Sequence, residues 1–142
     1  MAPMFTVRNP EFAARVRQIF DDAPFIQHLG VEVVAIAPGL VETALAPRAE
    51  HLQQDGVVHA GVVATLADHT AGAAAGTLMA ASQIVLTSEL GLHLLRPARG
   101  RLACRATVLK PGRTLTIVES EIRDPDGVLV AKLIATLAIV DR

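Results

Sequence analysis

The chain contains neither Trp nor Tyr, and its four Phe residues all lie within the first 25 positions. A ligand bound beyond that segment would therefore meet aliphatic side chains and backbone rather than aromatic rings. The single cysteine, Cys104, cannot form an internal disulfide, so nothing indicates an oxidising compartment. Charged residues make up only 19% of the chain, and the formal net charge is −1. Nucleic-acid-binding proteins normally carry a surplus of Lys and Arg, so that class is not expected.

Hydrophobic residues make up 51% of the 142 positions, which excludes intrinsic disorder and is enough to build one core. We find no linker, repeat or low-complexity tract, so we expect a single domain over residues 1–142, with residues 1–24 as an N-terminal helical extension. Arg8 and Glu11 lie where a signal peptide needs an apolar stretch. The sequence therefore predicts a soluble cytoplasmic protein.

The first half of the chain predicts helix, hairpin and helix. Asn9-Pro10-Glu11 is typical of a helix start, with one further helical turn expected at 25–29. Pro38-Gly39 divides two β-rich runs, 31–37 and 40–45, and so predicts a hairpin. The segment from His59 to about Ala81 lacks Pro and is rich in Ala, which favours a long helix.

The second half predicts four strands, separated by turns rich in Pro and Gly: 84–95, 101–109, 113–123 and 128–140. Strict alternation in the first of these strands puts Leu86, Ser88, Leu90, Leu92 and Leu94 on one face. It puts Thr87, Glu89, Gly91 and His93 on the other. The order of elements predicts an α+β fold in which an antiparallel sheet wraps around one buried helix.

Asp68 is the only charged side chain between Gly56 and Ser88, and it lies in the middle of the long helix. A membrane span is not expected, because Asp68 and His69 sit at its centre and Ala and Gly supply most of the rest. A solvent-facing position is not expected either, because the neighbouring turns offer no polar face. Two interpretations stay open: an ion pair with an Arg across a subunit interface, or a carboxylate at the edge of a reactive cavity. We favour the second.

His59 begins the same helix, where first-turn N–H groups lack internal partners and can stabilise an oxyanion. A histidine at this position alone is more often structural. His51, Asp55 and His69 lie nearby in sequence but show no spacing typical of metal ligands, so no metal is expected. Cys104 falls in strand alternation with apolar residues and is predicted to belong to the core rather than to act as a nucleophile.

The run Gly56-Val57-Val58-His59-Ala60-Gly61, continued to Asp68, resembles the signature of PaaI-like hotdog-fold thioesterases. In that family a Gly-x-x-His-Gly-Gly stretch leads into a central helix with an Asp nine residues after the His. The resemblance extends from about Phe25 to the chain end, including the Leu92–Ala98 segment, and covers about four-fifths of the chain. It implies a long helix wrapped by an antiparallel sheet, in agreement with the element order.

The resemblance also implies roles for individual residues. Asp68 would activate the attacking water or attack the thioester itself, and the Ala60 N–H would polarise the thioester carbonyl. Thr87 matches a position that holds the water in some relatives. Gln53 stands where the family usually has Asn, and its additional methylene moves the amide by about 1.5 Å, enough to cost about 10²-fold in rate. The neighbouring Gln54 is an alternative donor.

Three further points concern the substrate. Ala60-Gly61 replaces the family's Gly-Gly pair, and Gly61 is expected beside the substrate together with Gln54 and Arg96. Arg96, Arg99 and Arg101 surround one turn, which is either simply solvated or contacts the phosphates of coenzyme A. Coenzyme A is expected only as part of the substrate, with no separate cofactor.

We therefore expect an acyl-CoA thioesterase that hydrolyses acyl- or aryl-acyl-CoA. His59 and Asp68 are nine residues apart, or about 13 Å along a helix, so one chain cannot bring both to one thioester. This predicts a homodimer with shared sites, which in the family often forms a dimer of dimers. The alternative is an acyl-CoA-binding protein or sensor without turnover, which the Gln53 departure makes credible. Neither a nucleic acid nor a membrane is expected as a partner.

Overall fold

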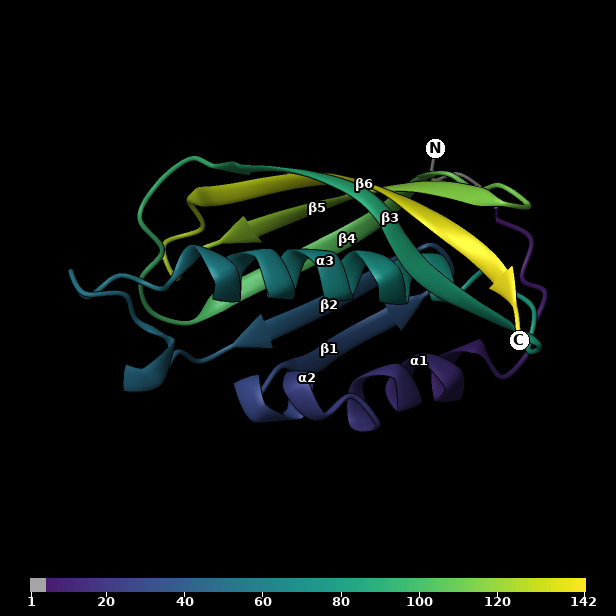
Figure 1. Ribbon diagram of the computed structural model, residues 1–142, viewed down its shortest axis with the longest axis horizontal. Coiled ribbons are helices and arrows are strands. Elements are labelled where there is room, and N and C mark those ends of the chain that lie inside the picture. The colour runs from purple at the N-terminus through teal and green to yellow at the C-terminus, as the bar shows by residue number, and fades with distance from the viewer. Residues whose placement is uncertain (1–4) are drawn as a thin grey trace.

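The computed structural model describes residues 5–142, and its elements follow the predicted order (Figure 1). The helices are α1 (Phe12–Asp21), α2 (Pro24–Leu29), the short 3₁₀ turn η1 (Ala49–His51) and α3 (Ala60–Gly76). The strands are β1 (Glu32–Ala37), β2 (Leu40–Leu45), β3 (Gln83–Leu94), β4 (Leu102–Lys110), β5 (Leu115–Arg123) and β6 (Leu129–Asp141). The predicted strand boundaries are thus correct to within two residues.

The six strands form one antiparallel sheet in the order β1-β2-β4-β5-β6-β3. The sheet curves around α3, while α1 and α2 lie beside β1 (Figure 1). This arrangement confirms the α+β fold with a central helix wrapped by an antiparallel sheet. No helix within residues 5–142 is both long enough and apolar enough to cross a membrane.

The face of α3 that packs on the sheet is built from small side chains. Ala67, Ala71 and Ala74 are all buried, and their small volume lets the helix lie close to the strands. The Ser120 hydroxyl on β5 donates a 2.8 Å hydrogen bond to the Ala67 carbonyl. A buried bond of this kind fixes the rotation of α3. It therefore helps to set the direction of the next side chain, Asp68.

The C-terminal end of α3 was predicted wrongly, because the helix stops at Gly76 rather than near Ala81. The Thr77 hydroxyl donates to the Ala74 carbonyl at 2.7 Å and accepts from the Gly39 N–H at 2.8 Å. It thereby ties the helix end to the β1–β2 turn and satisfies a carbonyl that a longer helix would have used. The chain then turns, and Leu78 and Met79 are buried.

The strict alternation predicted for β3 was also wrong, because the strand contains a β-bulge. Thr87 pairs with Leu137 and Glu89 pairs with Thr136, so the register shifts at Ser88. Directly paired residues share a face of the sheet, and Leu137 is fully buried on the face toward α3. Thr87 therefore lies on the α3 face.

The same bulge divides the leucines of β3 between the two faces. Leu90 and Leu92 pair with the buried residues Ala135 and Leu133, so they share the α3 face with Thr87. Leu86 precedes the bulge and lies on the opposite face. The bulge therefore places the Thr87 hydroxyl opposite Leu137 and beside the middle of α3, a position that uninterrupted alternation would have given to Ser88.

Candidate active site

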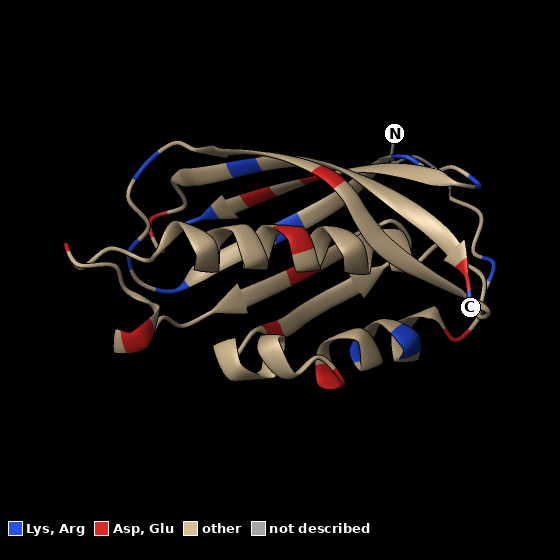
Figure 2. Cartoon of the chain, in the orientation of Figure 1, with Lys and Arg blue, Asp and Glu red and all other residues tan. Residues whose placement is uncertain are grey.

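Asp68 lies half-buried in the middle of α3 and is the only charged residue of that helix (Figure 2). The Thr87 hydroxyl donates a 2.8 Å hydrogen bond to Asp68 Oδ1. No other hydrogen bond to the carboxylate arises from residues 5–142, which leaves Oδ2 open to a ligand or water. The structure thus brings together two of the residues that the sequence singled out.

The Asp68 side chain borders a cavity of about 240 Å³ between α3, α1 and β3. Its walls combine apolar residues, such as Ile19 and Val85, with the basic side chain of Arg15. His69 also lines the cavity, but its Nε2 lies 3.2 Å from the Ile19 carbonyl and its ring packs edge-on against Phe20. Burial lowers the pKa of His69, which favours a neutral imidazole.

The beginning of α3 is fixed by hydrogen bonds on both sides of His59. His59 Nδ1 accepts a 2.8 Å hydrogen bond from the Gly61 N–H, and the His59 N–H donates to the His51 carbonyl at 2.9 Å. A Cβ at Gly61 would lie 3.1 Å from His59 Nδ1, so a side chain there would crowd the cap. Among residues 5–142 no acceptor occupies the Ala60 N–H, which lies at the positive end of the helix dipole.

Ala60 borders a second cavity, of about 500 Å³, together with Gln53, Gln54, His59 and Arg96. The Gln53 side-chain oxygen accepts a hydrogen bond from the Asp55 N–H, and Gln54 Nε2 donates to Asp55 Oδ2 at 3.2 Å. Arg96 donates a 2.7 Å hydrogen bond to the Leu129 carbonyl, so one of its guanidinium N–H groups contacts the first residue of β6. Gly61 does not line this cavity, and its N–H donates to His59 Nδ1.

The two cavities have no lining residue in common. Within one chain the helix N-terminus and the Asp68 carboxylate therefore belong to separate sites, as the 13 Å estimate predicts. Gln53, His59 and Ala60 line the cavity at the start of α3, and Asp68 and Thr87 line the cavity beside the middle of α3.

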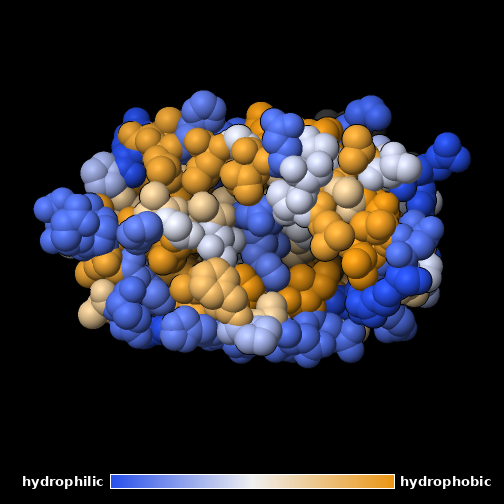
Figure 3. Space-filling model, viewed as in Figure 1, coloured by the Kyte–Doolittle hydropathy of each residue, from blue (hydrophilic) through white to orange (hydrophobic). Residues whose placement is uncertain are grey.

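Strand β3 forms one edge of the sheet and leaves large apolar side chains exposed. Leu86 is 54% exposed, Leu94 is 52% exposed and Leu90 is 41% exposed. Figure 3 shows hydrophobic residues gathered on this side of the molecule around a hydrophilic patch near the middle of α3. A long edge strand with exposed leucines is an unusual feature for a surface that faces only water.

Arg15 and Ile19 line the Asp68 cavity, and the sequence did not single them out as site residues. Ile19 follows the buried Val16 and precedes the buried Phe20 at helical spacing in α1, but no sequence pattern shows that this face packs beside Asp68. The Arg15 Nε atom is buried and has no hydrogen-bond partner among the residues that the structure describes.

Two other reactive residue types are held in the core. Cys104 is 2% exposed, and burial raises the pKa of its thiol to about 12, so the thiol stays protonated. This confirms its predicted place in the core. His51 is also buried, and burial lowers its pKa. Across residues 5–142 no three His, Cys, Asp or Glu side chains form a group that could hold a metal ion.

Comparison with known proteins identifies the family. Residues 55–131, which include the start of α3, Asp68 and Thr87, match the model of the thioesterase superfamily. A protein of Saccharolobus solfataricus provisionally named an esterase is 33% identical over 127 residues, which cover 88% of this chain and 90% of that protein. This chain belongs to the thioesterase superfamily.

Solved structures agree with that assignment. A thioesterase family protein from Silicibacter pomeroyi has a TM-score of 0.89 and 37% identity, covering 92% of this chain and 99% of that one. A variant of the phenylacetic acid degradation protein PaaI from Thermus thermophilus has a TM-score of 0.75 and 28% identity, covering 82% and 98%. The fold is therefore the hotdog fold, and the predicted resemblance to PaaI-like thioesterases is confirmed.

Proposed function

We propose that this protein is an acyl-CoA thioesterase, which hydrolyses an acyl- or aryl-acyl-CoA to the free acid and coenzyme A. The observation that carries the proposal is the Asp68 carboxylate, which lies beside a cavity and accepts a hydrogen bond from Thr87. A carboxylate held in this way has one oxygen oriented by the hydroxyl and the other free to meet a water or a carbonyl carbon. The match to the thioesterase superfamily supports the reaction class.

In the proposed reaction the thioester carbonyl oxygen accepts a hydrogen bond from the Ala60 N–H. Asp68 removes a proton from water as the water oxygen attacks the carbonyl carbon, which gives a tetrahedral oxyanion. The oxyanion collapses, the C–S bond breaks, and the coenzyme A thiolate takes up a proton. If Asp68 attacks the carbonyl carbon directly, an acyl-aspartyl anhydride forms first and water then releases the acid. Gln53 or Gln54 would contact the carbonyl from the loop before α3.

The proposal includes a homodimer in which each site combines the helix start of one chain with Asp68 of the other. The separation of the two cavities within one chain supports it, because neither cavity alone holds both the Asp68 carboxylate and the Ala60 N–H. The exposed edge of β3 supports it too, since pairing with a second copy would cover its leucines.

The first experiment follows thiol release from a panel of short, medium, long and aryl acyl-CoAs. Wild type is compared with Asp68→Asn and with a matched control, Asp126→Asn, which lies in the exposed β5–β6 turn. We expect saturable turnover that Asp68→Asn reduces at least 10²-fold in kcat/KM, while Asp126→Asn stays within about twofold of wild type.

Two results would contradict the proposal in different ways. Binding of acyl-CoA without turnover of any substrate would indicate an acyl-CoA-binding protein. The displaced amide of Gln53 would then be the first explanation to test for the missing turnover. Turnover that Asp68→Asn leaves unchanged would mean that Asp68 is structural and that another group activates water.

A further inference from the structure

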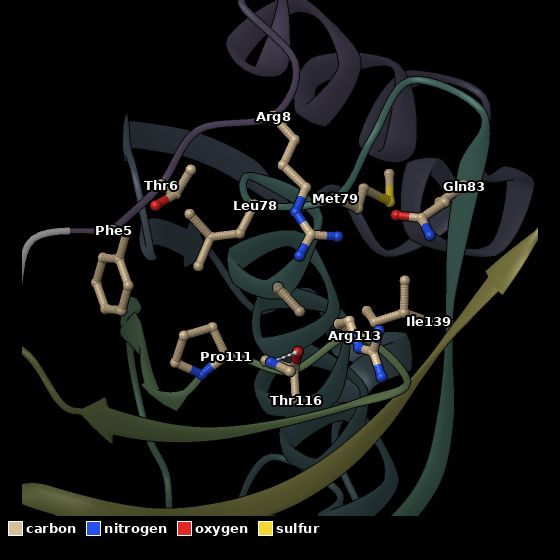
Figure 4. A pocket seen from close by; sticks show the side chains of 12 residues that line it. Phe5, Thr6, Arg8, Leu78, Met79, Gln83, Pro111, Arg113, Thr116 and Ile139 are labelled. Carbon is tan, nitrogen blue, oxygen red and sulfur yellow. Dashed lines mark hydrogen bonds between the residues drawn. The ribbon is translucent and has the colours of Figure 1, made fainter.

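A third cavity, of about 300 Å³, lies at the C-terminal end of α3, away from His59 and Ala60 (Figure 4). Its walls come from the N-terminal segment before α1, the α3–β3 connection and the β4–β5 turn. None of the residues proposed above for thioester hydrolysis lines it. Its volume is at the lower end of the range for small-molecule sites, about 300–1,000 Å³.

Most of the lining is either apolar or already hydrogen-bonded. Phe5, Leu78 and Ile139 supply apolar walls. The Thr116 hydroxyl accepts a 3.3 Å hydrogen bond from the Gly112 N–H. The Gln83 amide is used on both sides, because its oxygen accepts from the Ala80 N–H at 3.0 Å and its nitrogen donates to Asp141 at 3.3 Å.

Arg8 and Arg113 are the charged groups of this cavity. Figure 4 shows Arg8 reaching into the middle of the cavity, with Arg113 on its lower side. Within residues 5–142 neither guanidinium makes a hydrogen bond or an ion pair, and no Asp or Glu lines the cavity. Residues 1–4, Met-Ala-Pro-Met, contain no acid that could pair with them.

This placement is not explained by the fold itself. The two arginines are far apart in the sequence, yet the fold directs both to one small cavity whose walls are partly apolar. Both arginines are exposed to solvent, and their like charges still repel each other where they face the same cavity. An anion between them would reverse the sign of the interaction, and a guanidinium matches the geometry of a carboxylate or phosphate.

We infer that this cavity binds a small organic anion, consisting of one oxyanion group on a short apolar body. The oxyanion lies between Arg8 and Arg113, and the apolar body lies against Phe5, Leu78 and Ile139. The inference does not rest on thioesterase activity, because it uses none of the residues proposed for that reaction. An occupant would also touch Met79, which lines this cavity and the Asp68 cavity.

The test is a titration of the ¹⁵N-labelled full chain, followed by amide NMR shifts, with hexanoate and hexyl phosphate as probes. Hexanol supplies the apolar body without charge, and inorganic phosphate supplies the charge without the apolar body. We expect both amphipathic anions to shift the amides of Thr6, Gly112 and Arg113 saturably. Hexanol and inorganic phosphate should each bind at least tenfold more weakly. The anion that binds with the higher affinity then identifies the preferred head group, carboxylate or phosphate.

The double variant Arg8→Met/Arg113→Met should weaken hexanoate binding at least tenfold and leave the remaining amide spectrum in place. The matched control is Arg17→Met, which removes an exposed arginine of α1 that does not line this cavity. Equal affinity for hexanoate and hexanol, unchanged affinity in the double variant, or shifts confined to the amides around Ala60 and Asp68 would each overturn the inference.

Discussion

The Thr87 hydroxyl on β3 and the Asp68 carboxylate on α3 are joined by a 2.8 Å hydrogen bond. The contact depends on the β-bulge at Ser88, which turns Thr87 toward the helix while Leu90 and Leu92 continue on the same face. Thr87 thus orients one carboxylate oxygen and leaves the other free. A hydrogen bond to a charged group contributes about 1.5–3 kcal/mol, and each 1.4 kcal/mol corresponds to tenfold in rate.

We therefore expect Thr87→Val to lower kcat/KM for the best acyl-CoA by roughly 10- to 100-fold, because valine keeps the shape but removes the donor. Thr87→Ser keeps the hydroxyl and should stay within about threefold of wild type. Steady-state thiol release measures both variants. Equal losses in the two variants would indicate that the methyl group matters, and an unchanged Thr87→Val would remove Thr87 from the site.

The sequence predicts the fold of this chain well because its turns are marked by residue types with strong local preferences. Pro38-Gly39 and the other Pro- and Gly-containing turns place the strands to within two residues. The α3 segment is predicted by its Ala content, but its end is set by the Thr77 hydroxyl, which bonds to Ala74 and to the distant Gly39. A contact between residues so far apart leaves no periodic signal.

The site was predicted only in part, for a similar reason. Ile84, Val85 and Leu86 are consecutive apolar residues and are compatible with either phase of a strand, so alternation could not reveal the bulge at Ser88. Only the pairing with β6 decides which face Thr87 occupies. The packing of α1 beside Asp68, which brings Arg15 into the cavity, is likewise a tertiary contact that no local pattern encodes.

The Ala60 N–H can be removed without disturbing the helix, by the substitution Ala60→Pro. Proline is favoured at the first helical position, and His59 has ψ 138°, in the range that a residue before proline prefers. If this N–H stabilises the oxyanion, Ala60→Pro should lower kcat by about 10²- to 10³-fold while the thermal unfolding midpoint stays close to that of wild type. Full activity in this variant would exclude the Ala60 N–H as the oxyanion donor.

Shared sites predict complementation between two inactive variants. Asp68→Asn and Ala60→Pro chains that are unfolded together and refolded form mixed dimers, in which one of the two sites carries no substitution. Because half of the dimers are mixed and half of their sites are intact, we expect about 25% of wild-type activity to return. Each variant refolded alone is the control. No recovery in a mixture that demonstrably contains mixed dimers would place both groups of a site on one chain.

The burial of His69 makes the stability of the fold depend on pH. Burial lowers the pKa of His69 in the folded chain, although the Ile19 carbonyl and the Asp68 charge oppose this in part. The unfolded chain therefore binds more protons near and below the ordinary histidine pKa of about 6.5, and the free energy of unfolding falls as the pH drops through that value.

We expect His69→Gln to reduce this loss between pH 8 and pH 5.5, as measured by urea unfolding. His51, also buried, keeps part of the slope. The exposed His93→Gln is the matched control and should show the wild-type slope. An equal pH dependence in His69→Gln and wild type would mean that His69 becomes charged in the folded chain as readily as in the unfolded one.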